Sequence, residues 1–461
     1  MSEGTETSLV IEPDASRWGA LVRGYATGPR ASEMRRELGL PVDRRVIMTG
    51  HQAVFWHPGI LAKYIAADAA ARALDAQAAW VVVDHDTDDP WSVRYPARDG
   101  EGRLAARVFD LRGAGARREA SGVAVCRGAA IAPVERVPED AALPEVRAGL
   151  EAIRGAVAHH AGAANAARQV AGAVGELLAP MVSAAPVIFS TDLVRTTMFG
   201  VLLEAMNEDP RACVRAYNAA IVHAPGAGLR ALQADEVNER YELPLWRIGA
   251  DGVRRRVYAE ELESLPRHEL APRALLMTAL LRLGACDLFI HGTGGGLYEK
   301  ANDAWMQMWF GSGGEEGFER LAPVAVVTAT RRLALVEGAA PTGRDVARAK
   351  WAAHHARHDP AMLGDAAGGV RRRALVGAIK SARREGREPR RAFEALHEFL
   401  SECRGASAAR LGALERDVVE VMARARDAEV ASERTWAFAM YPRVALEGLC
   451  AEVAARFGGE T

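Results

Sequence analysis

Short apolar runs alternate with helical patterns between residues 45 and 330 of the chain. The run Val46–Met48 is followed by a helix start at Pro58-Gly59, whose helix carries apolar residues at three- and four-residue spacing, and by a second run, Trp80–Val83. A strand, a helix and a strand within about 40 residues are typical of a βαβ unit. Further apolar runs occur at residues 186–189, 287–290 and 323–327. Apolar strands separated by helices predict an α/β fold with a parallel sheet covered on both faces.

Two segments interrupt this alternation before the strand pattern ends near residue 340. Residues from about 91 to 135 are rich in Arg and Gly, and residues 240–262 contain a hairpin pattern around Asp251-Gly252, a strong turn pair. We therefore predict a core of residues 1–340 with two small insertions.

Residues 341–435 show helical patterns without strands. Six apolar residues there follow an a/d heptad, namely Leu411, Leu414, Val418, Val421, Ala425 and Ala428. The heptad predicts a helical hairpin or short coiled coil, which would form a homodimer if two copies packed together. A helix docked on its own domain explains so short a run equally well. Residues 436–461 are expected to return to the core.

Five polar turns follow the predicted strands. In an open parallel sheet, ligands bind beyond the carboxyl ends of the strands, because these ends share one edge. The turns therefore predict a single ligand-binding rim, although hundreds of residues separate them. They are Thr49-Gly50-His51, Asp84-His85-Asp86, Ser190-Thr191-Asp192, His291–Gly296 and Thr328–Arg331.

The first turn is a candidate anion site. His51 and His57 flank a loop that ends at a helix N-terminus, where phosphate or carboxylate groups bind readily. Imidazoles there could stabilise developing charge or act as acid and base, although a structural role for one of them fits the pattern equally well. Lys63, one of four lysines in an arginine-rich chain, follows within the helix. It either reaches back to an anion or lies at the surface.

The second turn surrounds a histidine with carboxylates. Asp84, His85 and Asp86 are followed by Asp88 and Asp89. Such a cluster can deprotonate an amine by general base catalysis or hold a divalent metal, and solvated loop acids are the alternative. No pair of His or Cys residues with zinc-site spacing accompanies the cluster, so no metal site is assigned.

The glycine-rich turn HGTGGG, residues 291–296, permits close approach of the backbone to a ligand. It does not match the dinucleotide-binding pattern GxGxxG, because Leu297 stands where the third glycine should be. The paired histidines His159-His160 and His354-His355 fall in helical segments without apparent partners, and we expect them to be structural or exposed.

Composition narrows the class of protein. The chain has 461 residues, a formal net charge of −2 and 49% hydrophobic residues, as is typical of soluble globular proteins. Balanced charge argues against nucleic-acid binding, which normally needs a basic face. Five scattered cysteines predict reduced thiols, no apolar run reaches the ~20 residues of a membrane span, and no signal peptide is visible. We therefore expect a cytoplasmic protein that acts on small molecules.

The order of these motifs resembles the bacillithiol biosynthesis cysteine-adding enzymes, a family described as cysteine ligases. Its members carry a TGQQ-type turn, a GP-containing helix start with a lysine, an EDHD segment, a Pro-linked Trp in a hairpin, a glycine-rich turn with a nearby Tyr, and a YP segment. The matching stretches cover most of the chain in the same order: Thr49-Gly50-His51-Gln52, Pro58-Gly59 with Lys63, Val83-Asp84-His85-Asp86, Leu243-Pro244-Leu245-Trp246, Gly294-Gly295-Gly296 with Tyr298, and Met440-Tyr441-Pro442.

The resemblance implies a Rossmann-like, doubly wound core and a coiled-coil dimerisation domain. It implies that the carboxyl group of cysteine is joined to the amino group of glucosaminyl malate, with ATP or ADP as the expected cofactor. Together with the rim, it indicates five catalytic residues, His51, His57, Asp84, His85 and Asp86. Substrate or nucleotide contacts are expected from Thr49, Gly50, Gln52, Lys63, Ser190, Asp192, His291, Gly292, Gly294, Gly295, Gly296, Tyr298 and Thr330.

Three departures from the family pattern fall in this set. His51 replaces the first Gln of TGQQ, Val83 replaces the leading acid of EDHD, and His57 stands before Pro58. The missing acid favours a second hypothesis, a divergent member that binds a nucleotide or another small molecule or acts as a metal-dependent hydrolase. A coiled-coil scaffold is a third hypothesis.

Overall fold

The computed structural model describes residues 8–458, except residues 27, 29, 114, 116–121, 312–317 and 319. The first seven residues, which belong to the segment considered for a signal peptide, and residues 114 and 116–121 of the first predicted insertion lie outside the described residues. The chain divides into a core unit, residues 1–96, 106–333 and 434–461, and a helical unit, residues 97–105 and 334–433.

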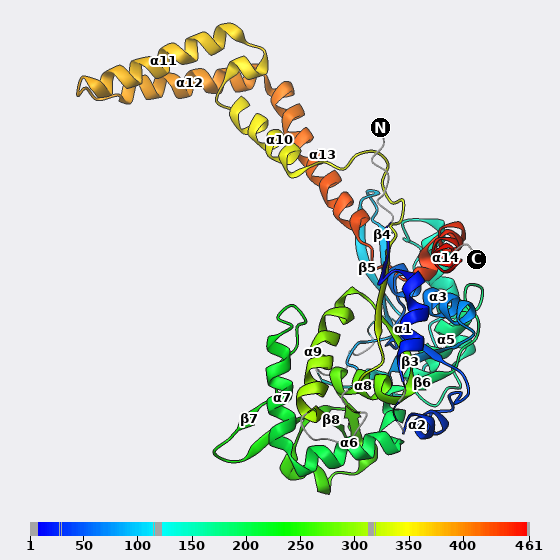
Figure 1. Ribbon diagram of the computed structural model, residues 1–461. Coiled ribbons are helices and arrows are strands. Elements are labelled where there is room, and N and C mark those ends of the chain that lie inside the picture. Colours follow the sequence, from blue (N-terminus) through cyan, green and yellow to red (C-terminus); the bar gives the residue numbers. More distant parts are fainter. Residues whose placement is uncertain are drawn as a thin grey trace. The chain divides into compact units, whose positions relative to one another are not determined.

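A six-stranded sheet forms the centre of the core unit (Figure 1). Its strand order is β1 (Ser8–Glu12), β12 (Val324–Thr330), β11 (Leu288–His291), β2 (Val46–Gln52), β3 (Gln77–Val83) and β6 (Val187–Phe189). The five strands from β12 to β6 are parallel, and β1 pairs antiparallel with β12 at the edge. The predicted α/β fold with a mostly parallel sheet is confirmed.

Two strands run further than their apolar runs predicted. β2 continues through His51 and Gln52, which pair with β3. β12 continues to Thr330 because β1 pairs with it, with Ser8 opposite Thr330. The sequence predicted turns at these polar residues, but pairing with a neighbouring strand decides where a strand ends. Gly50 fits this pairing because a Cβ there would lie 2.2 Å from the carbonyl oxygen of Val81.

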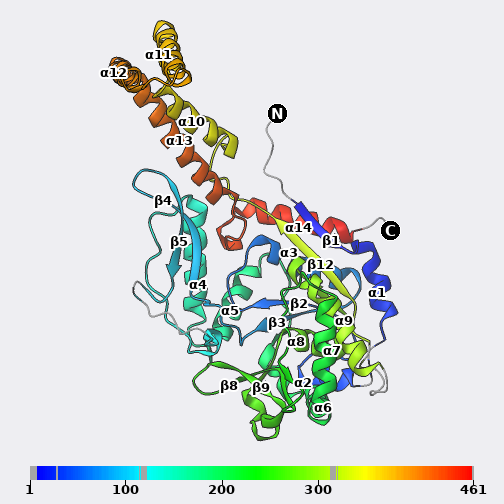
Figure 2. The ribbon, with the colours of Figure 1, turned by 90° about the vertical axis from the view of Figure 1, so that its left-hand side faces the viewer.

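Helices cover both faces of the sheet (Figure 2). The face against β2 and β12 carries α3 (Pro58–Ala73), with α14 (Arg443–Phe457) packed on α3 and α5 (Ala166–Leu178) against β3. On the other face, Met48 and Val81 belong to an apolar cluster built with α2 (Ala31–Glu37), α6 (Thr197–Glu208), α7 (Pro210–Val222), α8 (Ala274–Leu280), η6 (Leu281–Ala285) and α9 (Thr293–Phe310). The remaining helical segments of this unit are α1 (Trp18–Gly24), α4 (Pro144–His159), η1 (Ala15–Arg17), η2 (Val125–Arg127), η3 (Ser190–Arg195), η4 (Ala259–Ser264), η5 (Arg267–Glu269) and η8 (Phe438–Met440).

The strand order reverses between β2 and β11. From β2 the chain builds outward through β3 to β6, whereas the later strands β11 and β12 lie on the other side of β2. At such a reversal the connecting helices leave on opposite faces and open a crevice beyond the carboxyl ends of the strands. The ends of β2 and β11, at Gln52 and His291, therefore flank the expected ligand-binding position.

A smaller antiparallel sheet contains β7 (Ala234–Asp235), β8 (Arg240–Ile248), β9 (Arg254–Tyr258) and β10 (Leu270–Pro272). The predicted hairpin is confirmed, because Trp246 of β8 pairs with Arg256 of β9. Gly252 in its turn has φ +70°, which glycine adopts without strain. In the first predicted insertion, β4 (Ser92–Arg98) and β5 (Leu104–Asp110) form a two-stranded sheet.

The helical unit contains α10 (Gly343–Ala356), η7 (Pro360–Leu363), α11 (Ala366–Arg384), α12 (Arg390–Ala406) and α13 (Ala408–Ser432). α10 packs along α13, and α11 packs along α12. The six heptad residues all lie on α13 and are half-buried. Packing on α10 accounts for part of that stripe, and a coiled coil with a second chain stays a prediction. Among the described residues, no helix has both the length and the apolar character needed to cross a bilayer.

Candidate functional site

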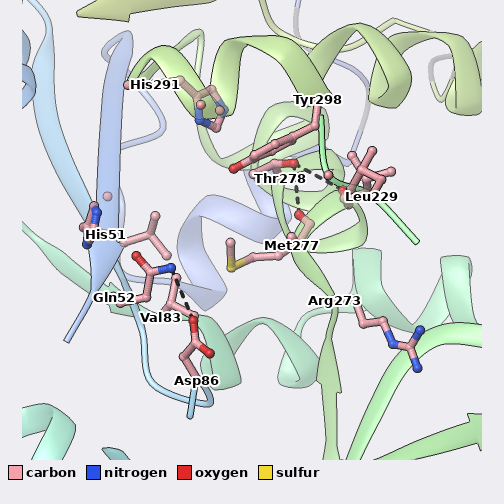
Figure 3. Close-up of a pocket in the computed structure, with 18 of the residues that line it drawn as sticks. His51, Gln52, Val83, Asp86, Leu229, Arg273, Met277, Thr278, His291 and Tyr298 are labelled. Atoms are coloured by element: carbon pink, nitrogen blue, oxygen red, sulfur yellow. Dashed lines mark hydrogen bonds between the residues drawn. The ribbon is translucent and has the colours of Figure 1, made fainter. Parts of the chain in front are cut away.

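A cavity of about 700 Å³ lies at the carboxyl ends of β2, β3 and β11 in the core unit. Its wall is completed by the N-termini of α3 and α9 and by the smaller antiparallel sheet. Figure 3 shows the side chains that surround it, with His51, Gln52, Val83 and Asp86 on one side and Arg273 and Leu229 on the other.

Most of the predicted site residues line this one cavity. They are Gly50, His51, Gln52, His57, Lys63, His85, Asp86, His291, Gly292, Gly294, Gly295 and Tyr298. Thr328 of the fifth predicted turn also lines it. Four of the five turns therefore reach the same cavity, and the turn at Ser190 contacts it indirectly through His85.

Besides Ser190, four other predicted contact residues do not line the cavity, namely Thr49, Asp192, Gly296 and Thr330. Thr49 is fully buried and donates to the carbonyl oxygen of Ile290 (2.9 Å). Asp192 accepts from the backbone N–H of Phe189 and pairs with Arg195. A Cβ at Gly296 would lie 2.5 Å from Val326, so this glycine lets α9 approach β12. Thr330 pairs with β1. These polar and small residues serve the fold.

The variant Thr49→Val tests whether Thr49 stabilises the fold rather than binds a ligand. The substitution preserves shape and removes one buried hydrogen bond, so the free energy of unfolding should fall by about 1 kcal/mol. Urea denaturation measures this loss. Binding of any ligand in the cavity should keep its affinity, since Thr49 does not touch it. A large loss of ligand affinity with an unchanged free energy of unfolding would show that Thr49 belongs to the binding site.

His85 is held by a relay of hydrogen bonds behind the cavity wall. Its Nδ1 lies 2.7 Å from Ser190 Oγ, and Ser190 Oγ lies 2.8 Å from Asp84 Oδ1. A carboxylate only accepts, so the hydroxyl of Ser190 donates to Asp84 and must accept from Nδ1–H of His85. This order places the proton of neutral His85 on Nδ1 and leaves the lone pair on Nε2. His85 therefore presents a base to the cavity.

Burial keeps that imidazole neutral. All of His85 but a few per cent is buried, and burial lowers its pKa below the usual 6.5, although Asp84 and Asp86 oppose the shift. Asp84 itself does not line the cavity. Its oxygens already accept from Ser190, from the backbone N–H of Thr191 and from the Thr191 hydroxyl. The acid predicted to touch substrate instead orients the histidine.

Asp86 is the carboxylate of this turn that reaches the cavity. It accepts from the amide of Gln52 (3.2 Å; Figure 3) and from Arg254 Nη1 (3.3 Å). The position of the acid missing from the family pattern, Val83, also lines the cavity. The apolar side chain of Val83 brings no negative charge to this wall.

Lys63 is an amine buried without a counter-charge. Its Nζ donates to the carbonyl oxygen of Gly50 (2.7 Å), and no carboxylate of the described residues forms an ion pair with it. Burial lowers its pKa from 10.5 to about 7. An anion in the cavity would restore the charge of the amine, because opposite charges nearby favour the ionised form. The helix phase turns Lys63 inward, which the sequence left open.

The two histidines of the first turn have different roles. His57 Nδ1 accepts from the backbone N–H of Gly59 (3.0 Å) and so caps α3, and the residue lines the cavity. His51 is buried, and burial, Lys63 and His57 together lower its pKa to about 3. Its Nδ1 has no hydrogen-bond partner within the described residues. His51 is therefore neutral at pH 7 and is not a cationic anion-binding group.

The glycine-rich run is the start of a helix rather than a turn. α9 begins at Thr293, and Gly292, Thr293, Gly294 and Gly295 line the cavity. The first N–H groups of a helix lack intrahelical acceptors and carry partial positive charge. The N-termini of α3 and α9 thus both reach the cavity, and they offer donors to an anionic group.

His291 joins the cavity to a buried ionic cluster. Its Nε2 lies 3.0 Å from Glu299 Oε1, and Glu299 also pairs with Arg282. Burial would raise the pKa of Glu299, but His291 and Arg282 outweigh it and lower that pKa to about 2. Burial lowers the pKa of His291. Because Arg282 is always charged, Glu299 has a permanent counter-ion in this cluster.

A cationic wall was missed by the sequence analysis. Five arginines line the cavity, against the two carboxylates Asp86 and Glu242: Arg230, Arg254, Arg256, Arg273 and Arg434. Arg273 lies over the ring of Trp246 (3.9 Å to the centroid) and pairs with Glu242 (2.6 Å). The period-two spacing of Arg254 and Arg256 on β9 was the available signal, since alternate residues share one face of a strand.

Comparisons with known proteins leave the family open. No protein-family model matches the chain, and no curated protein matches it. The likeness to the cysteine-adding enzymes therefore remains a resemblance of motifs. The residues of the cavity carry the chemical argument, and they offer a neutral imidazole base, an unpaired buried amine and a cationic wall.

Proposed function

We propose that the cavity is the active site of a ligase that joins the carboxyl group of an amino acid, by resemblance cysteine, to the amino group of a small anionic acceptor such as glucosaminyl malate. The observation that carries the proposal is the relay from Asp84 through Ser190 to His85, which presents a neutral base to the cavity. An amine must lose its proton before it can attack a carboxyl carbon, and a positioned imidazole removes such protons near neutral pH.

His85 Nε2 takes the proton of the incoming amine in this mechanism. As the bond from nitrogen to carbon forms, the relay stabilises the imidazolium, because Nδ1–H stays directed at Ser190 and the charge of Asp84 lies behind it. Asp86 and Gln52 are placed to orient the amine, since both line the cavity beside His85. The bond from the carboxyl carbon to its activated oxygen then breaks, and that oxygen would leave with the phosphoryl group that ATP supplies.

Anion binding is the second half of the proposal. Lys63, the N-termini of α3 and α9 and the five arginines surround one cavity, and two carboxylates oppose them. This donor set fits the phosphates of ATP or ADP and the carboxylates of a malate-like acceptor. When bound, ATP would supply the energy to activate the carboxyl group. Tyr298 and Trp246 add aromatic surface beside these groups.

The resemblance extends the proposal to the architecture. The core unit would be a Rossmann-like fold that binds its ligands at the reversal of strand order. The helical unit would be a coiled-coil domain that pairs two chains through the heptad face of α13. A mass of twice the chain in solution, measured by light scattering, would agree with this part of the proposal, and a monomer at micromolar concentration would contradict it.

The activity is tested with the purified chain, cysteine, glucosaminyl malate and ATP. Mass spectrometry should detect a product whose mass is that of both substrates minus one water, and omission of any one substrate should abolish it. Serine and alanine in place of cysteine would define the amino acid. Calorimetry is the matched measurement: nucleotide binding without metal supports the ligase, whereas tight manganese binding alone without product would favour the metal-dependent hydrolase and contradict the proposal.

A further inference from the structure

A second cluster of ligand-type side chains lies on the surface of the core unit, outside the cavity. His159 ends α4, His160 follows it, and Glu176 lies on α5, which packs against α4. His159 Nδ1 is 2.8 Å and His160 Nε2 is 3.3 Å from the same atom, Glu176 Oε2. The sequence suggested no partner for either histidine. The structure brings both to one carboxylate oxygen.

The three side chains suit a transition-metal ion in chemistry and spacing. Two imidazoles and one carboxylate are a ligand set that Zn²⁺ uses with water in the fourth position. Their nearest donor atoms all lie within 4.8 Å of one another. With metal–ligand bonds of about 2.0–2.2 Å, neighbouring ligand atoms of a tetrahedral site are roughly 3.3 Å apart. The separations of the two imidazole nitrogens from Glu176 Oε2, 2.8 and 3.3 Å, are close to that value.

A glycine on α5 allows the His160 side chain to lie beside Glu176. A Cβ at Gly172 would lie 2.5 Å from His160 Nδ1, so the imidazole is seated directly on the backbone of α5. Gly172 is one helical turn before Glu176, on the same face. Glycine inside a helix destabilises the helix relative to alanine. At position 172 the absence of a Cβ makes room for the imidazole ring of His160. His159 and His160 also stand at the C-terminal end of α4, where the helix dipole favours a cation.

We propose that His159, His160 and Glu176 bind one divalent transition-metal ion, Zn²⁺ by their chemistry, which cross-links α4 to α5. Each imidazole would coordinate through the nitrogen that now faces Glu176, and water would complete the shell because the cluster is open to solvent. None of the three residues lines the cavity, so the metal would fasten a helix pair rather than take part in amide formation.

Calorimetry with ZnCl₂ on the metal-stripped, untagged full chain tests the proposal. One zinc ion should bind per chain, and His160→Ala and Glu176→Gln should each weaken it by about 10-fold or more, since even the loss of an outer partner of a metal ligand costs about 10- to 100-fold. Co²⁺ should give a visible absorption spectrum of nitrogen and oxygen ligation in the wild type that both variants lack.

Two glycine variants separate the ligand geometry from a general effect on α5. Gly172→Ala keeps all three ligands but pushes the His160 ring away, so it should also weaken zinc binding. Gly175→Ala, on the same helix with nothing within 4 Å of its Cβ, should bind as the wild type does. The pair His354-His355 on α10 is the competing candidate for zinc binding. His354→Ala removes the first histidine of that pair. Binding lost in His354→Ala but kept in His160→Ala and Glu176→Gln, or no zinc binding at millimolar concentration, overturns the proposal.

Discussion

His85→Gln should lower kcat by about 100- to 10,000-fold while the protein stays folded, the range that general base catalysis contributes. His85 lines the cavity but is almost fully buried, and one of its nitrogens is engaged by Ser190. Glutamine is similar in polarity and can still bond to that hydroxyl, but it cannot accept the proton of an amine. The measurement is turnover in the amide-forming assay, with circular dichroism to show that the fold is kept.

Asp84→Asn is the sharper variant, because it leaves all three side chains of the relay in place. An asparagine amide can donate to Ser190, so the Ser190 hydroxyl can turn and donate to His85 Nδ1 instead. The proton of the imidazole then moves to Nε2, and the base no longer faces the cavity. The loss in kcat should approach that of His85→Gln, with KM little changed.

Nitrogen NMR of the histidine ring distinguishes this change from a structural one. The wild type should show the Nδ1–H tautomer of His85, and Asp84→Asn should show the Nε2–H tautomer. Because burial lowers the pKa of His85, the acid limb of kcat/KM should fall below pH 6.5 in the wild type. His223→Ala, an exposed histidine at the end of α7, is the matched control and should change neither measurement. Full activity of His85→Gln would remove the base from the mechanism.

Lys63→Met should make the protein more stable and at the same time unable to bind its anionic ligand. The amine of Lys63 is buried, and no carboxylate of the described segments pairs with it, so the folded protein must either bury a charge or release a proton. Methionine fills similar volume without that cost. A residue kept at the expense of stability is typical of a functional site.

The direction and size of the stability change in Lys63→Met follow from the pKa of Lys63, which is about 7 in the folded protein and 10.5 ordinarily. Between these values the unfolded chain binds more protons, so this group makes stability rise with pH. Its penalty is complete below about pH 7 and disappears towards pH 10.5. At 1.36 kcal/mol per unit the penalty is at most about 5 kcal/mol, and the lost hydrogen bond to Gly50 offsets about 1 kcal/mol.

Urea denaturation at pH 6.5 and pH 9.5 measures the effect. Lys63→Met should exceed the wild type in free energy of unfolding, and the difference should shrink at the higher pH. Malate and ATP should raise the melting temperature of the wild type but not of the variant. Lys380→Met, an exposed lysine on α11, is the matched control and should leave both measurements unchanged. A Lys63→Met protein that is less stable at pH 6.5 and still binds these anions would contradict the assignment.

The periodic pattern alone determined the class of fold and the edge of the sheet at which the cavity lies. Apolar runs of β length alternate with helical segments, and burial on both faces of a sheet is the stable outcome for such runs. Parallel strands end at one edge, so His51, His85 and His291 could be assigned to one rim although they are far apart in the sequence. That rim is the cavity wall observed.

Only the tertiary structure decided which polar residues face the cavity. Thr49 and His51 are two positions apart on β2. The hydroxyl of Thr49 donates a hydrogen bond to β11, whereas His51 lines the cavity. Asp84 and Asp86 differ in the same way. The carboxylate of Asp84 accepts hydrogen bonds from Ser190 and Thr191, whereas Asp86 lines the cavity. Polarity is readable from a sequence, but the partner that satisfies a polar atom comes from a distant segment. The cationic wall has the same origin, since its five arginines come from separate segments, with Arg254 and Arg256 on β9 and Arg434 near the C-terminus.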